Sequence, residues 1–433
     1  MTWFSRQKTP LSLRRRLGFA DSSRRNRHGT RYLPALEGME QRALLAGGPS
    51  TVFVDAHAVG TPDGTKQHPY PTIEEGVNAS SPGGTVIVAA GLYNESVTVN
   101  KRLTIDGADR GKERVNHTGP ADPNRESIVQ PPAGAGFDVA ADKVVIDGFT
   151  VQEALGVPGI QLSSSFSGYV VRENVINANP NNGVGIQFGS SGVQKSVIEH
   201  NFFYGSADRG GSQVDAISTN PGLQNAEISH NTFFRNDSAG VVIVQSHGPN
   251  SGIEIDHNDS IEDGSLVALF NAPGTSIDHN TILRSSGSAI FIGSGNDGTS
   301  ISHNQISGAQ FRGIHIDAPE FGGPANANMI IDHNDIRNMA GTGIGVAPNS
   351  LVNSLIDHNQ VQNNSGGGIS IEAGGNGGNV ISDYQLKHNG DGVTTFDARD
   401  DTTGTGTAGT ANTWVQNEGQ TSSPPGLLKK KGS

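Results

Sequence analysis

The stretch that decides the fold reads Ile255-Asp-His-Asn258 and, 22 residues later, Ile277-Asp-His-Asn280. The same pattern of an apolar residue, two polar residues and Asn recurs along the chain at intervals of 22 to 30 residues. Its copies end at Asn174, Asn201, Asn231, Asn258, Asn280, Asn304, Asn334, Asn359 and, in a degenerate ninth form, Asn389. Self-similarity at such a period predicts a repeat architecture in which each copy is one structural unit.

Short apolar alternations lie between the copies. Examples are Gly240-Val-Val-Ile243, Gly313-Ile-His-Ile316 and Gly368-Ile-Ser-Ile371. Period-two alternation over four or five residues is typical of a half-buried strand. Each repeat therefore offers two or three short strands separated by tight turns. Asn suits a turn that needs a left-handed backbone, and its amide can bond to the amide of the next coil.

A repeat of this length with short strands and no helical pattern predicts a β-solenoid, and the pattern of leucine-rich repeats is absent. The repeats resemble those of the right-handed parallel β-helix, the pectin-lyase-like family. The resemblance covers roughly residues 50–400, with the repeat core at 171–389. We therefore expect an all-β, right-handed parallel β-helix of roughly 11 or 12 coils. The resemblance is specific for the fold and implies no single activity, because the fold hosts unrelated chemistries.

The sequences at the two ends of the expected β-helix differ from the repeats. Residues 71–77 start like a helix, with Thr72 and Glu75 at capping-box spacing, and a short helix here would cover the open first coil. Residues 401–433 are rich in Thr and Gly and end in a basic tail. We interpret them as an extension over the last coil, anchored by Trp414.

The charge is unevenly distributed. Residues 1–46 carry ten Lys and Arg against three Asp and Glu, and Lys429–Lys431 add three positive charges. The total is −12, so the remaining body carries a net charge of −22. An acidic body repels nucleic-acid phosphates. The basic segment 1–46 lacks apolar periodicity, and we expect it to be disordered.

Residues 36–46 resemble the LE-x-x-E-x-R-x-LL segment near the start of many large bacterial surface and secreted proteins. The resemblance implies export, with processing or anchoring near Ala46 and a secreted or cell-surface location. The alternative is a short amphipathic helix at a floppy terminus. No apolar run approaches ~18 residues, so we expect no transmembrane segment. The chain has no Cys, which excludes a disulfide scaffold, a Cys-ligated zinc site and a thiol nucleophile.

Eight of the 14 His precede one of the repeated Asn residues, and a parallel solenoid would stack them ~4.8 Å apart. Two His and a carboxylate can bind zinc or copper, and an Asp immediately precedes four of these His. Adjacent residues on a strand point to opposite faces, so we expect a His and its preceding Asp not to share a metal. We interpret the column as a structural ladder of neutral imidazoles that would repel itself once protonated below about pH 6.

The outward positions of the Gly-flanked strands form a second column. It reads Gln187, Val242, Ala268, Phe291, His315, Gly345 and Ser370, and two residues later a neighbouring column includes Phe270, Asp317 and Glu372. Most of this face is small or apolar, but its polar members cluster, and Arg312 opens the same strand as His315. Phe270 and Phe291 lie just before the cluster and could stack on a sugar ring.

Two chemistries fit these candidate catalytic residues. For β-elimination of a uronate, His315 could be the base and Arg312 the clamp on the carboxylate. For glycoside hydrolysis, Asp317 and Glu372 could be the acid pair, ~10 Å apart across two coils. The bland alternative is that a long solenoid exposes some charged residues by default.

A third candidate is the insertion at residues 205–215, where Asp208 and Asp215 could bind calcium through oxygen ligands. The sequence has no Asp-x-Asp pair of the kind that β-helix hydrolases show, and no Lys/Arg pattern of the pectate lyases. The catalytic residues of the family therefore carry over to no position.

These features leave three functions open. The first is an exported, monomeric β-helix that acts on or binds a polysaccharide or cell-envelope glycan, with a lyase or a glycoside hydrolase as the enzymatic forms. The second is a non-catalytic surface rod for adhesion or structure. The third is a periplasmic β-helix that carries metal on its His column.

Overall fold

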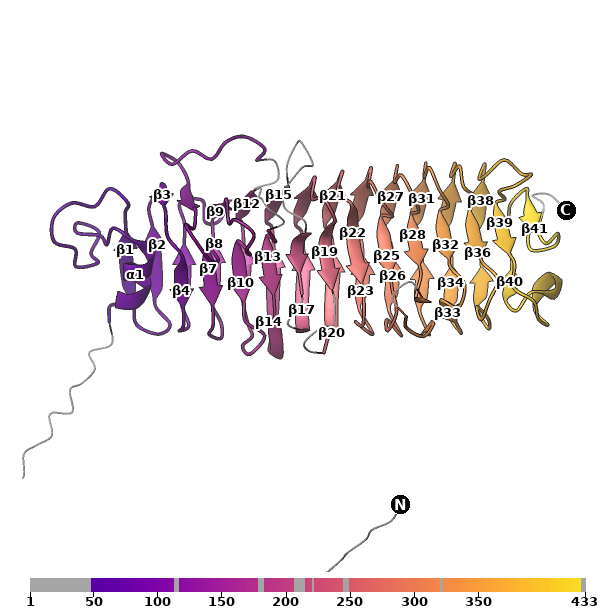
Figure 1. Cartoon of the computed structure of the whole chain (residues 1–433), viewed down its shortest axis with the longest axis horizontal. Helices are drawn as coiled ribbons and strands as arrows, with labels where there is room; N and C mark the ends of the chain where they lie inside the picture. The colour runs from indigo at the N-terminus through magenta and orange to yellow at the C-terminus, as the bar shows by residue number, and fades with distance from the viewer. Residues whose placement is uncertain are drawn as a thin grey trace, which may run out of the picture. The chain divides into compact units, whose positions relative to one another are not determined.

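The computed structural model describes residues 48–112, 117–177, 183–205, 215–219, 222–243, 249–319 and 322–429. Within these ranges the chain winds into three long sheets of 14, 13 and 12 strands, and the strands within each sheet pair in parallel (Figure 1). Apart from the first two strands, which both belong to the 14-strand sheet, strands that follow one another in the chain fall in different sheets, as a solenoid requires. The predicted parallel β-helix is confirmed, and the 12 strands of the shortest sheet agree with the expected number of coils.

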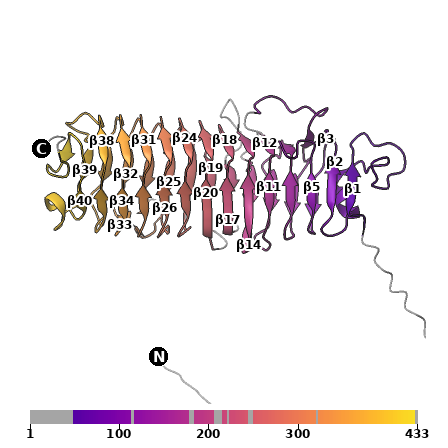
Figure 2. The same ribbon diagram turned by 180° about the vertical axis from the view of Figure 1, so that it is seen from behind.

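The 14-strand sheet begins every coil (Figures 1 and 2). Its strands are β1 (Thr51–Val54), β2 (Thr85–Val88), β5 (Thr104–Asp106), β8 (Val145–Asp147), β11 (Val170–Arg172), β14 (Ser190–Glu199), β17 (Leu223–Ser229), β20 (Ser251–Asp256), β23 (Ser276–Asp278), β26 (Ser300–Ser302), β30 (Ile330–Asp332), β34 (Leu355–Asp357), β37 (Val380–Ser382) and β40 (Thr413–Val415).

The 12-strand sheet follows after a tight turn. Its strands are β3 (Gly91–Tyr93), β6 (Ser127–Val129), β9 (Phe149–Gln152), β12 (Val175–Asn177), β15 (Phe202–Tyr204), β18 (Thr232–Phe234), β21 (Asp259–Ile261), β24 (Thr281–Leu283), β27 (Gln305–Ser307), β31 (Asp335–Arg337), β35 (Gln360–Gln362) and β38 (Gln385–Lys387).

The 13-strand sheet completes the coil. Its strands are β4 (Val97–Val99), β7 (Phe137–Val139), β10 (Ile160–Leu162), β13 (Ile186–Phe188), β16 (Asp215–Ser218), β19 (Ala239–Ile243), β22 (Ser265–Leu269), β25 (Ile290–Ile292), β28 (Ile314–Ile316), β32 (Ile344–Val346), β36 (Ile369–Ile371), β39 (Ala398–Asp400) and β41 (Ser422–Ser423). A short pair, β29 (Asn326–Ala327) and β33 (Leu351–Val352), stands outside the three sheets.

The core is a set of apolar columns inside the three sheets. In the 14-strand sheet the middle residues of successive strands pair in register, from Ile255 to Ile277 and on to Ile301. These side chains are fully buried. Burial of each such side chain contributes ~1.5–3 kcal/mol, so a coil adds stability only when a neighbour covers it.

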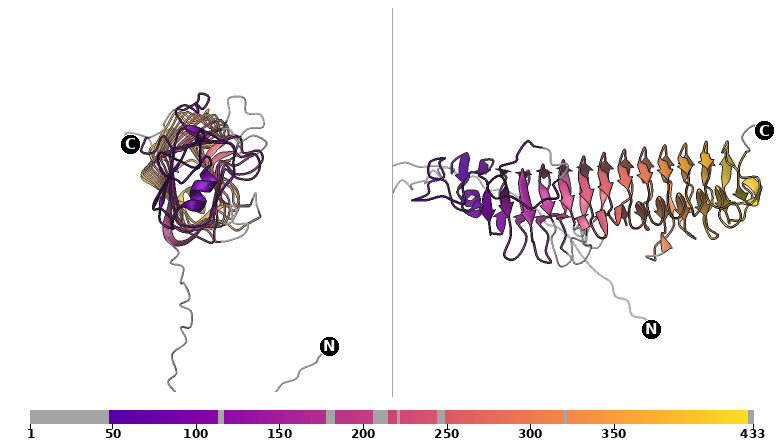
Figure 3. Two further views of the ribbon diagram at one scale, coloured as in Figure 1. Left: turned by 90° about the vertical axis from the view of Figure 1, so that its left-hand side faces the viewer. Right: turned by 90° about the horizontal axis from the view of Figure 1, so that it is seen from above.

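The helix α1 (Ile73–Ala79) lies at the N-terminal end of the solenoid (Figure 3). The hydroxyl of Thr72 accepts a hydrogen bond from the Glu75 backbone amide at 3.2 Å, as the capping pattern predicts. Ile73 and Val77 are buried against the core. Glu95 adds a second cap, because its carboxylate accepts from the amides of Ile73 and Glu74 at 2.8 and 2.9 Å.

The Thr/Gly-rich segment after residue 400 contributes strands to the stack. β40 pairs with β37, and β41 pairs with β39. Trp414 occupies the core position that Ile381 holds one coil earlier, and its indole N–H donates to Asp400 Oδ2 at 2.8 Å. A 3-10 turn, η2 (Thr407–Gly409), lies between these strands.

A ladder of buried Asn side chains joins the coils at the turn between the 14-strand and 12-strand sheets. From Asn174 to Asn359, each Asn backbone amide donates to the side-chain oxygen of the next Asn at 2.9–3.0 Å. The side-chain amide of Asn280 also donates to the carbonyls of Ile255, one coil back, and Asp278. The predicted amide ladder is confirmed.

The prediction that Asn adopts the left-handed backbone in this turn is wrong by one position. The residue before each Asn has the positive φ, for example 52° at His279 and 55° at His303. Asn is needed instead for the buried ladder, where both its donor and its acceptor are used. His at the preceding position tolerates the left-handed region better than most residues.

The ninth sequence copy is also corrected. His388 and Asn389 follow β38 of the 12-strand sheet, whereas the earlier copies follow strands of the 14-strand sheet. Asn389 accepts from Asn364, in a second ladder one turn further around the coil. The true successor of His358-Asn359 is Asp383-Tyr384, and the Tyr384 hydroxyl accepts from Asn359 at 2.6 Å. The interval of 30 residues between Asn359 and Asn389 falls within the range of the other repeats, so the sequence did not show that Asn389 lies at a different turn of the coil.

We predict that Asn280→Ala lowers the free energy of unfolding by at least about 1–3 kcal/mol, because the buried amide of Asn258 loses its acceptor. Urea unfolding followed by circular dichroism measures this loss. Gln305→Ala, at an exposed position of β27 one coil on, is the matched control and should change stability little. Equal effects of the two substitutions would show that the ladder contributes nothing special.

Candidate functional site

The outer face of the 13-strand sheet carries the predicted outward column. Register pairs align Phe291 with His315, His315 with Gly345, Gly345 with Ser370, and Ser370 with Arg399. Their neighbours Ile290, Ile314, Ile344 and Ile369 are fully buried. The predicted inward and outward directions are therefore confirmed.

Arg312 lies across this face rather than pointing away from it. Its Nη2 atom is 3.1 Å from Glu372 Oε1, two coils further along the stack. A Cβ atom at Gly345, on the coil between them, would lie 2.6 Å from the Arg312 Cδ atom. Gly345 therefore leaves the space through which Arg312 reaches Glu372.

A groove of about 470 Å³ opens beside this ion pair. We call it the sheet-face groove, and its lining consists of Arg312, Thr342, Pro348, Gly366, Ser370, Glu372, Ala373, Arg399 and Asp401. Arg399 makes a two-pronged contact with Asp401, at 2.6 Å from Nη2 and 3.0 Å from Nε. The groove thus contains two positive and two negative side chains, arranged as two ion pairs.

Sequence reasoning found Arg312, Ser370 and Glu372 but missed Arg399 and Asp401. The predicted outward column ended at Ser370, because the coil that contains β39 has only the degenerate copy of the His-Asn pattern, which ends at Asn389. The alternation Ala398-Arg399-Asp400 is the signal that could have extended it, since Ala398 and Asp400 are buried and Arg399 is exposed.

His315 is covered by aromatic rings on the same face. The rings of Phe291 and Phe311 contact its imidazole edge-on, with centroids 5.1 and 5.4 Å away. Only 9% of its side chain is exposed. Burial, aided by the positive charge of Arg312, lowers the pKa of His315 to about 4. The imidazole is therefore neutral at pH 7, and its Nε2 atom lies 3.8 Å from Asp317 Oδ2.

The structure thus divides the expected catalytic set. Arg312 and Glu372 line the sheet-face groove together, whereas His315 and Asp317 form a separate pair outside its lining. Phe270 and Phe291 lie next to each other, with ring centroids 5.7 Å apart and planes tilted by 43°. Phe291 also packs against His315, so it supports that imidazole as well as offering a surface.

The predicted calcium pair is described only in part. Asp208 lies outside the described residues. Asp215 is the first residue of β16, and burial raises the pKa of its carboxyl to about 6. Calcium binding at this pair remains a prediction.

The His column is the second notable surface. Seven imidazoles stack with centroids 4.8–5.0 Å apart, from His200 through His230, His257, His279, His303, His333 and His358. From His230 to His358 the ring planes lie within 9° of parallel. The predicted column is present, and it follows the edge of the 14-strand sheet.

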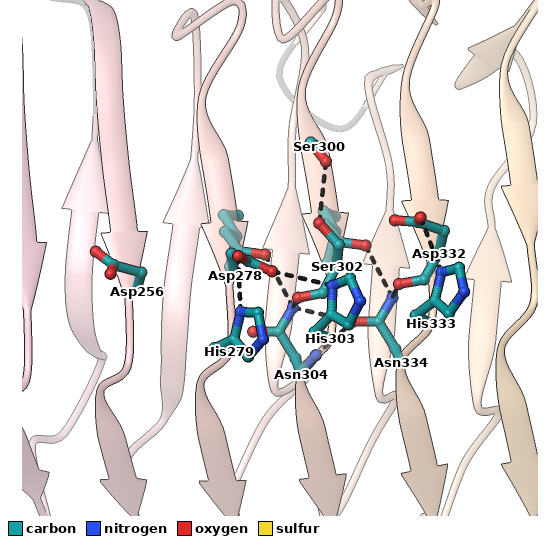
Figure 4. Close-up of polar contacts among 12 residues, drawn as sticks. Asp256, Asp278, His279, Ser300, Ser302, His303, Asn304, Asp332, His333 and Asn334 are labelled. Atoms are coloured by element: carbon teal, nitrogen blue, oxygen red, sulfur yellow. Dashed lines mark hydrogen bonds and ion pairs between the residues drawn. The ribbon is translucent and has the colours of Figure 1, made fainter.

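The expectation that His and its preceding Asp face opposite ways is wrong. The Nδ1 atoms of His279 and His333 lie 2.8 and 3.0 Å from the carboxylates of Asp278 and Asp332 (Figure 4). The same contact is 2.9 Å between His257 and Asp256 and 2.6 Å between His358 and Asp357. The positive φ of each His bends the chain out of the strand and turns the ring back beside the Asp. The alternation of strand side chains does not apply there.

One of these carboxylates, Asp357, also alters the expected response to acid. The hydrogen bond that the His358 imidazole donates to the Asp357 carboxylate raises the pKa of His358. A raised folded-state pKa means that His358 contributes stability below its ordinary value near 6.5 and loses that contribution as the pH rises through the folded-state pKa. At this coil the Asp357 carboxylate opposes the repulsion that was expected between stacked imidazolium rings.

Two family models match the chain. Residues 215–386 match "Right handed beta helix region", and residues 57–259 match "Protein of unknown function (DUF1565)". No match was found among curated protein sequences. Among the described residues, no helix is long and apolar enough to cross a membrane.

Solved structures agree on the fold. A PL6 alginate lyase in complex with a trisaccharide is similar over 90% of this chain and 89% of its own, with a TM-score of 0.54 and 13% identity. The structure of the alginate lyase AlyF-OU02 with G6 is similar over 82% of this chain and 89% of its own, with a TM-score of 0.50 and 14% identity. The structure of the Dettilon tailspike protein is similar over 79% of this chain and 68% of its own, with a TM-score of 0.50 and 13% identity. At these identities the likeness concerns the fold alone.

We predict that His315 costs the protein stability in acid. Its folded-state pKa lies below its unfolded value, so the unfolded chain takes up a proton first and stability falls as the pH drops from about 6.5 towards 4. Between pH 7 and pH 4.5 the wild type should lose about 2–3 kcal/mol more than His315→Leu, which has no such group. Urea unfolding at both pH values tests this, with His57→Leu at an exposed position as the control. An identical pH dependence in wild type and His315→Leu would contradict the buried, neutral imidazole.

Proposed function

We propose that this parallel β-helix protein is exported and binds a polysaccharide in the sheet-face groove. The observation that supports this most directly is the pair of ion pairs, Arg312 with Glu372 and Arg399 with Asp401, at the outer face of the 13-strand sheet. Guanidinium and carboxylate groups held in this way offer fixed donors and acceptors to sugar hydroxyls.

The charge balance of the groove selects the kind of polysaccharide. Arg312 already has Glu372 as its partner, so it is not a free clamp for the carboxylate of a uronate. The described body of the protein is also acidic, which disfavours a polyanion. A neutral polysaccharide fits both facts better than an acidic one.

The same contacts favour binding over cleavage. β-Elimination needs a base at the sugar and a neutralised uronate, but His315 is mostly covered and Arg312 is paired. Hydrolysis needs one carboxyl group that can protonate the glycosidic oxygen. Both carboxylates of the groove are held by an arginine instead. We therefore place binding before lyase or hydrolase activity.

Support for a glycan partner and for export comes from outside the groove. Two structures of similar fold are alginate lyases, one in complex with a trisaccharide and one with G6. Export is supported by the resemblance of residues 36–46 to segments of secreted bacterial proteins, and that segment lies outside the described residues. A rigid surface rod without a ligand is the competing function.

We predict that Gly345→Val weakens polysaccharide binding by about tenfold or more, a change of ~1.4 kcal/mol. The new side chain takes the space of the Arg312 stem and separates Arg312 from Glu372 without removing a charge. Glu372→Gln should weaken binding similarly. Affinity electrophoresis on neutral and acidic polysaccharides measures the effect, and Glu254→Gln, on the 14-strand sheet, is the control.

Reducing-end and ultraviolet assays on the same polysaccharides, with and without calcium, separate binding from turnover. Binding without new reducing ends or unsaturated products supports the proposal. Turnover that Gly345→Val abolishes would make the groove an active site. Tight binding of polyuronates that neither groove variant affects would overturn the proposed site, and no binding to any polysaccharide would favour the surface rod.

A further inference from the structure

Two imidazoles of the His column, those of His230 and His303, do not follow an acidic residue in the chain. His257, His279, His333 and His358 each follow an Asp, but His303 follows Ser302. The Ser302 hydroxyl lies 3.1 Å from that of Ser300. His303 therefore turns to the carboxylate of the preceding coil, and its Nδ1 atom lies 3.4 Å from Asp278 Oδ1.

Asp278 consequently stands between two imidazoles (Figure 4). Its Oδ2 atom is 2.8 Å from the Nδ1 of its own neighbour, His279, and its Oδ1 atom faces His303. This Oδ1 atom is shielded from solvent and makes no hydrogen bond within the described residues. The column thus brings one carboxylate and two imidazoles together, with one possible ligand atom of each within 4.8 Å of the others.

From this geometry we propose that Asp278, His279 and His303 form a site for a borderline divalent transition-metal ion such as Zn²⁺. Zinc binds imidazole nitrogen and carboxylate oxygen at ~2.0–2.2 Å, so tetrahedral ligand atoms lie about 3.3–3.5 Å apart. The contact of His303 with Asp278 Oδ1, 3.4 Å, matches this spacing, and the contact of His279 with Asp278 Oδ2, 2.8 Å, is shorter. Both rings are about half exposed, so they can turn towards an ion while water completes its coordination.

The backbone prepares the site. Both His residues have left-handed φ values, and the buried Asn280 and Asn304 that follow them are bonded to each other in the ladder. The rings stack with centroids 4.8 Å apart and planes within 2°. A metal site built on such fixed turns loses little freedom on binding, and two nitrogen ligands favour zinc or copper over calcium.

A second acidic and imidazole set is a weaker candidate. Asp357, His358 and Asp383 also lie within 4.8 Å of one another, but they provide a single imidazole. Both oxygens of Asp357 are occupied, one by the Ser382 hydroxyl and one by His358. The inference therefore concerns one site per chain, at Asp278.

Calorimetric titration of the chelator-treated full chain with ZnCl₂ at pH 7.5 tests this site. We expect saturable binding of one ion per chain. His303→Asn should weaken binding by at least the roughly tenfold that loss of a supporting partner costs, and Asp278→Asn should do the same. Asn tolerates the left-handed backbone that His303 occupies, so the first variant keeps the turn. Circular dichroism and the melting temperature without zinc confirm that each variant is folded.

The matched control is His333→Asn, which removes an equally stacked imidazole that has its own Asp332. It should bind zinc as the wild type does. No saturable binding by the wild type, or equal weakening by His333→Asn and His303→Asn, would overturn the site, the latter because the whole column would then be binding ions. Polysaccharide binding should be unchanged in all three variants, since the sheet-face groove lies on another sheet.

Discussion

The structure depends on satisfying the buried polar groups of one turn. Where the chain leaves the 14-strand sheet, the backbone amides of the buried Asn residues point along the stack and donate to the next coil. An Asn at this position supplies an acceptor to the coil before it and donors to backbone carbonyls, so each buried group finds a partner. An unpartnered amide there would cost about 1–3 kcal/mol per coil, which explains why the same residue type recurs from Asn174 to Asn359.

The surface chemistry of the His column follows from that turn. Because Asn must be buried, the residue before it has to reverse the chain with a left-handed backbone, and its side chain points outwards. Repetition then places an imidazole on seven successive coils, from His200 to His358, at about 5 Å spacing. The preceding strand residue decides what each ring faces. Where it is Asp, the imidazole has a carboxylate of its own, and where it is Ser302, the imidazole shares Asp278 with its neighbour.

The sheet-face groove follows the opposite logic, because it depends on departures from the repeat. Gly345 stands where other coils carry a side chain, so Arg312 can lie along the stack and meet Glu372. Arg399 then extends the face by one more coil and meets Asp401. A solenoid offers long uniform faces, and a change of one or two residues per coil is enough to hollow and charge one part of a face.

The sequence by itself determined the architecture. The Asn spacing, the apolar alternation and the capping residues Thr72 and Glu75 are local patterns, and each coil repeats the same local requirements, so the fold and the facing of Ile314 or His315 could be predicted from them. Sequence also placed Arg312, Ser370 and Glu372 on one face. It misjudged Asn389, because equal spacing cannot tell which of two turns in a coil a copy occupies.

Only the tertiary structure decided which side chains meet. The partner of Arg312, Glu372, lies 60 residues away in the sequence. The two side chains meet because stacking places them two coils apart and because Gly345, on the coil between them, leaves room for the Arg312 side chain. The imidazole–carboxylate contacts depend on the positive φ of each His, which the alternation of strand residues does not predict. The covering of His315 by Phe291 and Phe311 depends on two different parts of the coil. Local periodicity fixes the direction of a side chain, whereas its chemistry depends on neighbours that stacking brings from other coils.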